Sequence, residues 1–165
     1  MAERRSTSLL DATVNPYRYR VSLRLHHPTR DLSDATFALK LTPRRQWAHG
    51  SPRTTIAGAA LPGTNDGSYW YSELIPAEAR DSREKDVEDA LAEFHDLHLA
   101  PHKEYFDSIR ADGGWIEFYI GLFASENFGI EFTSELLALM APFGVRLSLD
   151  VYPSASAKAS KNPFG

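Results

Sequence analysis

Alternating apolar and polar residues mark three segments of this chain. In residues 17–25 every odd position is Tyr, Val or Leu, and every even position is Arg or Ser. The same alternation recurs in residues 115–123 and 145–152. A period of two is typical of a strand that has one covered and one solvated face. The sequence therefore predicts three such strands, each with its apolar side turned toward a layer of helices.

Residues 86–110 show the spacing of an amphipathic helix. The apolar positions are Val87, Ala90, Leu91, Phe94, Leu97, Tyr105 and Ile109. Pro101 interrupts this pattern, because proline lacks a backbone N–H and clashes with the preceding helical turn. The sequence predicts one long kinked helix here, or two helices.

Two further helices are predicted from capping residues. Thr133 can cap a helix that ends at Gly144. Its buried positions are expected to be Leu136, Leu139, Met140 and Phe143. Asp31 or Ser33 can cap a short helix earlier in the chain. On that helix, Phe37 and Leu41 are expected to share one face.

Glycine, proline and turn residues dominate residues 49–67. This composition predicts a loop or a loose hairpin. The first strand of such a hairpin would be Arg53 to Ala57, and the aromatic run Tyr69 to Tyr71 would be the second.

The order of these elements is strand, helix, two strands, helix, strand, helix, strand. It predicts an α+β fold with a mixed, largely antiparallel sheet of about five strands and helices on one face. Strand, link and helix occur twice, which also allows two ferredoxin-like halves. We expect a single domain over residues 16–153, a flexible N-terminal segment over residues 1–15, and a disordered tail over residues 154–165.

Composition narrows the class of protein. The 165 residues include no cysteine, which excludes disulfides, thiolate nucleophiles and Cys-ligated metals. A net charge of -4, with both signs interspersed, offers no general attraction to nucleic acid or to anionic membranes. No apolar run approaches a membrane span, and no signal peptide is evident. We therefore expect a cytoplasmic protein without nucleic-acid or membrane partners.

Three segments carry a resemblance to a known family. They are the first strand followed by Leu39-Lys-Leu-Thr-Pro43 and Trp47-Ala-His-Gly50, the helix from Leu97 to Ile109, and the run from Trp115 through Leu136-Leu137 to Leu149-Asp-Val-Tyr152. In these segments the chain resembles the uncharacterised, mainly bacterial domain of unknown function 4279. The resemblance implies a compact α+β domain and no established reaction. It favours protein binding, since small bacterial domains of this kind include immunity proteins. The insertion around Gly58 to Asn65 departs from the pattern.

The one candidate metal site is a group of three histidines. His95, His98 and His102 are three and four residues apart, which places their imidazoles along one stripe of a regular helix. A zinc protease would need Glu after the first His of the pair, and Leu99 follows His98. The ordinary interpretation is a solvated helix edge, so no metal ligand, cofactor site or catalytic residue is assigned.

The polar sides of the three strands define a candidate interface. Its residues are Arg18, Arg20, Arg24, Glu117, Tyr119, Arg146, Asp150 and Tyr152. One interpretation is a solvated face with weak ion pairs. The other is a contact surface, because Tyr and Arg dominate the binding energy of protein interfaces. The carboxylates of Glu117 and Asp150 argue against RNA.

These observations favour a non-enzymatic protein-binding module, immunity-like or regulatory, whose partner is another protein or a second copy of the chain. The alternative hypothesis is a metal-dependent enzyme of unknown substrate that uses the three histidines. A third is a purely structural homo-oligomer.

Overall fold

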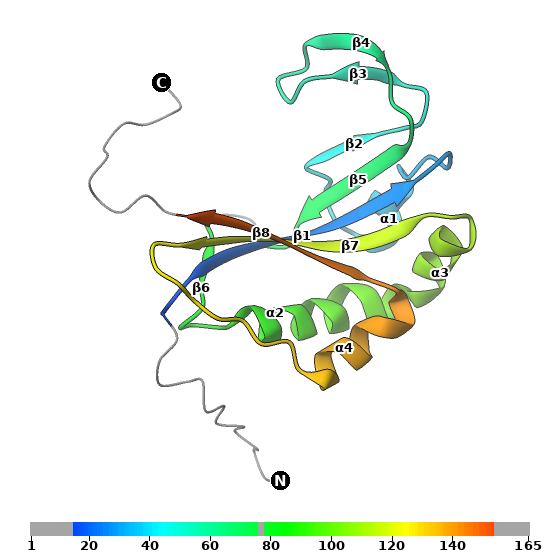
Figure 1. Ribbon diagram of the computed structural model, residues 1–165. Helices are drawn as coiled ribbons and strands as arrows, with labels where there is room; N and C mark the ends of the chain where they lie inside the picture. Colours follow the sequence, from blue (N-terminus) through cyan, green and yellow to red (C-terminus); the bar gives the residue numbers. More distant parts are fainter. Residues whose placement is uncertain (1–14, 76–77, 154–165) are drawn as a thin grey trace.

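A mixed sheet covered on one side by helices forms the frame of the protein (Figure 1). The computed structural model describes residues 15–75 and 78–153. The strands of this sheet, in spatial order, are β2 (Arg45–Trp47), β5 (Ser68–Glu73), β1 (Arg18–His27), β7 (Trp115–Ala124) and β8 (Arg146–Pro153), and β6 (Arg80–Asp81) also pairs with β1. All pairs are antiparallel except β7 with β8. The predicted α+β class is confirmed, whereas the two ferredoxin-like halves are not.

The parallel pair of β7 and β8 follows from the helix between them. Parallel neighbours need a long crossover, and here it contains α4 (Ser134–Met140) and the 3-10 turn η3 (Ala141–Phe143). The Thr133 hydroxyl accepts a hydrogen bond from the Leu136 N–H, as predicted for the cap. Gly144 ends η3 with a positive φ of 57°, which favours glycine.

The predicted kinked helix consists of four pieces. These are α2 (Val87–Phe94), the π-helical turn η1 (His95–Leu99), the 3-10 turn η2 (Ala100–His102) and α3 (Lys103–Ala111). Pro101 cannot donate to the carbonyl four residues back, so the chain changes its hydrogen bonding around it. The Ala100 N–H bonds to the His95 carbonyl, five residues back, as in a π turn. The break at Pro101 is thus confirmed.

The core lies between the sheet and the helical layer (Figure 1). The odd positions of β1 and the even positions of β7 from Ile116 to Leu122 are buried, as the alternation predicted. The largest buried side chains are Trp70, Tyr19, Phe106 and Phe118. Their polar atoms are satisfied, since Trp70 Nε1 donates to Thr36 Oγ1 at 3.1 Å and the Tyr19 hydroxyl donates to the Lys85 carbonyl at 2.8 Å.

Several apolar side chains expected in the core are exposed. Phe37 is 90% exposed, because α1 (Ala35–Leu39) is only five residues long and turns Ala35 and Leu39 inward instead. Leu97 is exposed because the π turn shifts the angular spacing that the prediction assumed. Leu139 is exposed at the border of the face on which α4 buries Leu136 and Met140.

The hairpin prediction is wrong in its second strand. The hairpin is formed by β3 (Pro52–Thr54) and β4 (Ala60–Thr64), which constitute a sheet of their own at the top of Figure 1. Gly58, with a φ of 86°, closes its turn by donating to the Thr55 carbonyl. The aromatic run Tyr69 to Tyr71 belongs to β5, which lies between β1 and β2, because Trp70 fills the core.

The predicted terminal segments lie, apart from Asn15, outside the described residues. Within the described part of the chain, no helix has both the length and the apolar character that a membrane crossing requires.

Candidate functional site

The sheet has a second face that none of the described helices covers, and we call it the open face. Its residues are Arg45, Trp47, Tyr69, Tyr71, Glu73, Arg18, Arg20, Ser22, Arg24, His26, Trp115, Glu117, Tyr119, Gly121, Phe123, Arg146, Ser148, Asp150 and Tyr152. They share this face because they are cross-strand neighbours at alternate positions. All eight interface residues predicted from the sequence are among them.

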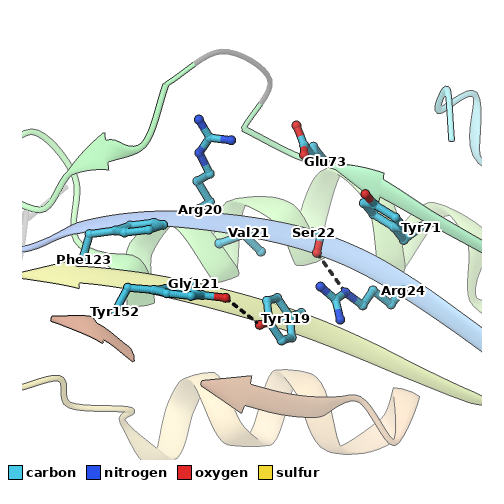
Figure 2. A pocket seen from close by; sticks show the side chains of 10 residues that line it. All are labelled: Arg20, Val21, Ser22, Arg24, Tyr71, Glu73, Tyr119, Gly121, Phe123 and Tyr152. Atoms are coloured by element: carbon cyan, nitrogen blue, oxygen red, sulfur yellow. Dashed lines mark hydrogen bonds between the residues drawn. The ribbon is translucent and has the colours of Figure 1, made fainter. Parts of the chain in front are cut away.

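A hollow of about 180 Å³ lies in the middle of the open face (Figure 2). Its floor is made by Ser22 and Gly121, two small residues surrounded by large ones. The residues that line it are Arg20, Val21, Ser22, Arg24, Tyr71, Glu73, Tyr119, Gly121, Phe123 and Tyr152. The hollow therefore exists because the residues at its floor are too small to fill the space between the arginines and tyrosines.

Arg24 forms one wall of the hollow and is held by three neighbours. Its guanidinium carbon lies 3.4 Å from the centre of the Tyr119 ring and 5.6 Å from that of Tyr71. Its Nε donates to Ser22 Oγ at 3.2 Å (Figure 2). Such cation–π contacts place a positive charge at a defined position.

Tyr119, Asp150 and Tyr152 form a hydrogen-bonded cluster beside Arg24. Both tyrosine hydroxyls donate a hydrogen bond to the same oxygen of Asp150. The Phe123 ring stacks on the Tyr152 ring with the two centroids 5.1 Å apart. Burial and the hydrogen bond with Asp150 raise the pKa of the Tyr119 hydroxyl. The hydrogen bonds from Tyr119 and Tyr152 lower the pKa of the Asp150 carboxyl. The carboxylate is thus ionised and both phenols are oriented.

A second cluster surrounds His26 at the other end of the open face. Its ring stacks on Trp115 with centroids 3.6 Å apart, and its Nε2 lies 3.8 Å from the Glu117 carboxylate. Burial lowers the pKa of His26 to about 4 although Glu117 opposes this shift, so the imidazole is neutral at pH 7. Glu117 is itself buried and accepts a hydrogen bond from Ser148. The guanidinium carbon of Arg146 lies over the Trp115 ring, 4.2 Å from its centre.

Aromatic rings continue the open face onto β2. Trp47 packs against Tyr69 with their ring centroids 4.5 Å apart. The guanidinium carbon of Arg45 lies 5.0 Å from the centre of the Trp47 ring. The interface predicted from the sequence includes neither Trp47 nor any residue of β5, such as Tyr69. The alternation of Tyr69, Trp70 and Tyr71 was the available signal, since a buried Trp70 turns both tyrosines outward.

Two predicted interface residues differ from expectation in their surroundings. Glu117 lies on the open face but is buried under its neighbours. Arg18 lies at the far end of β1, where its side chain donates to the Ala79 carbonyl at 2.8 Å and pairs with Glu78 at 3.5 Å. The remaining predicted residues, from β1, β7 and β8, lie in or around the two clusters.

The three histidines do not form a shared site. His95 is buried, contacts the edge of the Phe143 ring, and pairs its Nδ1 with Asp96 at 2.9 Å. Burial, with His102 nearby, lowers the pKa of His98. Over residues 15–75 and 78–153, no three His, Asp or Glu side chains are grouped so that they could hold a metal ion. The predicted stripe assumed a regular helix, and the π turn η1 breaks that spacing.

A family model described as "Domain of unknown function (DUF4279)" matches residues 16–154, which include every strand and helix described above. No curated protein and no solved structure matches the chain. The open face therefore lies entirely within the region that the family model covers.

Proposed function

The chain belongs to the DUF4279 family, and from this premise we propose that its α+β domain is a non-enzymatic protein-binding module whose contact surface is the open face. In this proposal a protein partner lies across the sheet and inserts one side chain into the central hollow. An immunity-like or regulatory role is the class of function that such a module would serve.

The hollow among arginines and tyrosines is the observation that carries the proposal. Tyr, Trp and Arg are the residues that contribute most to binding energy at protein interfaces, and such residues cluster in well-packed pockets near the centre of the interface. At about 180 Å³ the hollow is smaller than the ~300–1,000 Å³ of typical small-molecule sites. It suits an anchoring side chain better than a whole ligand.

The side chains around the hollow are already held in place. Arg24 is fixed by Tyr119 and Ser22, and Tyr152 by Asp150 and Phe123. Ordering a long side chain on binding costs about 0.5–1.5 kcal/mol, and this cost is reduced where contacts within the free protein already order it. A partner would therefore meet a preorganised surface.

The rival hypothesis of a metal-dependent enzyme has no comparable support. It depended on His95, His98 and His102, and His95 packs into the core against Phe143.

Affinity purification from an extract of the native host tests the proposal. The variant Arg20→Glu with Arg146→Glu reverses two charges of the open face, and Gly121→Leu fills the hollow without a backbone clash, because a Cβ there has 3.6 Å to its nearest neighbour. We expect both variants to lose a protein that the unaltered chain retains. The control, Lys40→Glu with Arg83→Glu, makes the same change in charge at exposed positions away from the open face and should retain it. Retention of every bound protein by both open-face variants would contradict the proposal.

A further inference from the structure

β8 is an edge strand of the sheet that the described residues form. Among the described strands it pairs with β7 alone, so its other edge presents backbone N–H and C=O groups that have no strand partner. Natural sheets usually blunt such edges by shortening them, and the opposite edge strand, β2, is only three residues long. β8 is eight residues long. A long open edge of this kind is a template for another strand.

The helical side of β8 carries exposed apolar side chains. Leu149 is 49% exposed and Val151 is 53% exposed, although the alternation predicted that both would be covered. The helical layer covers this last strand of the sheet only in part, since Leu147 is also only partly buried. Within residues 15–75 and 78–153, this strand therefore has no backbone partner on its outer edge, and its apolar side is only partly covered.

The residues of β8 are complementary to themselves in antiparallel register. A two-fold axis at Ser148 places Arg146 opposite Asp150 of a second copy, and Asp150 opposite its Arg146. It also places Leu147 opposite Leu149 on the helical side. Opposite charges directly across an antiparallel pair stabilise it, and like charges destabilise it.

Other registers are less favourable. A shift of one residue would set the open face of one copy beside the helical face of the other, because alternate side chains point to opposite sides. An axis at Asp150 would bring two aspartates together, and an axis at Leu149 would leave both Arg146 and Asp150 without an opposite charge. Charge complementarity thus selects the axis at Ser148.

We propose that β8 pairs in antiparallel fashion with β8 of a second copy of this chain, about a two-fold axis at Ser148. The two sheets then form one continuous sheet with both helical layers on the same side. The two open faces also become continuous. This inference does not depend on the proposed protein partner, because it rests on the edge of the sheet and not on the hollow.

Two single charge variants test both the dimer and its register. In Arg146→Asp the two opposed positions are both acidic, and in Asp150→Arg both are basic. We expect each variant alone to dimerise about tenfold more weakly or worse than the unaltered chain. A mixture of the two variants restores both opposite-charge pairs and should form a heterodimer. Sedimentation equilibrium of the full chain over a range of concentrations measures these affinities.

A third edge variant, a control variant and a measurement of folding distinguish loss of the dimer from loss of the fold. Leu149→Lys places a charge on the helical side of the edge at a half-exposed position and should also weaken the dimer. Lys40→Glu is the control, since it reverses an exposed charge that lies outside both β8 and the open face, and it should leave the dimer intact. Circular dichroism confirms that each variant is folded.

If the unaltered chain is a monomer at every concentration, the inference is overturned. The edge of β8 would then be available only to a strand from another protein. Unchanged dimerisation of Arg146→Asp and Leu149→Lys would also overturn it, because the contact would then lie elsewhere. Loss of a partner protein by Gly121→Leu with an intact dimer would separate the proposed function from this pairing.

Discussion

Gly114 shows, at the scale of single residues, how little space remains where α3 turns into β7. A Cβ at this position would lie 2.5 Å from Ile109 Cγ2 and 2.8 Å from the His26 carbonyl oxygen. The second neighbour is backbone and cannot rotate away. Only a residue without a side chain lets the strand begin this close to β1.

We therefore predict that Gly114→Ala lowers the free energy of unfolding by about 1–3 kcal/mol, the usual cost of overpacking. Gly129→Ala is the matched control, since a Cβ there meets nothing within 4 Å. It should leave stability unchanged or raise it slightly, because alanine reduces the entropy of the unfolded chain. Urea denaturation measures both, and equal stabilities of the two variants would refute the packing argument.

His26 gives a prediction about pH. Its pKa is about 4 in the folded protein and 6.5 in the unfolded chain, so the unfolded state binds more protons between these values. The free energy of unfolding should therefore fall as pH decreases from about 6.5 to about 4, by roughly 2 kcal/mol from this residue. His26→Phe keeps a ring against Trp115 but cannot titrate. Urea titrations at several pH values should show a smaller loss in the variant, and an identical loss would exclude His26 as the cause.

Individual outward positions on β1, β7 and β8 were predictable, but their partners were not. The alternation of apolar and polar residues placed Arg24 and Tyr119 on one face because it depends only on the backbone period. That Arg24 stacks on Tyr119, 95 positions later in the numbering, depends on the register between β1 and β7. The hollow was likewise not predictable, since it requires Ser22 and Gly121 to be diagonal neighbours on the adjacent strands β1 and β7.

The β3–β4 hairpin stands apart at the scale of elements. All eight residues of its two strands are exposed. Among the described strands, these two pair only with each other. One link to the main sheet is the hydrogen bond from Arg45 to the Thr54 carbonyl. The hairpin therefore adds little burial to the fold.

We predict that replacing residues 53–63 by an Asn-Gly turn changes the free energy of unfolding by less than about 1 kcal/mol, because shortening an exposed loop has a small effect on chain entropy. Thermal unfolding of the shortened chain provides the measurement. A large loss of stability, or of cooperative unfolding, would mean that the hairpin supports the sheet.

The pairing of elements explains why the hairpin was assigned incorrectly. Both Ala60–Thr64 and Tyr69–Tyr71 follow turn residues, and strand propensity favours the aromatic run. Trp70 is fully buried in the core beneath β5, and its burial places the run Tyr69 to Tyr71 in the main sheet. Burial of a large aromatic side chain overrides local turn signals.

At the scale of the whole molecule, β1 holds the fold together. It pairs with β5, β6 and β7, and its odd positions supply buried side chains from one end of the core to the other. β7 shares the longest register with it. The stability of the molecule is thus concentrated in its two central strands.

Native-state hydrogen exchange should reflect this distribution. We predict the slowest exchange for the amides of β1 and β7, which open only with global unfolding, and the fastest for those of β3 and β4 among the strands. Mass spectrometry of peptic fragments measures the rates. Equal protection of the hairpin and the central strands would contradict this account of the fold.

The sequence by itself determined the α+β class, the three alternating strands, the break at Pro101 and the caps at Thr133 and Gly144, because each depends on neighbouring residues and on the period of the backbone. Only the tertiary structure decided the strand order, the partners within the hairpin, the exposure of Leu149 and Val151, and the hollow of the open face. These features arise from contacts between residues that are distant along the chain. Such contacts are selected by the joint packing of the core, which no local pattern records.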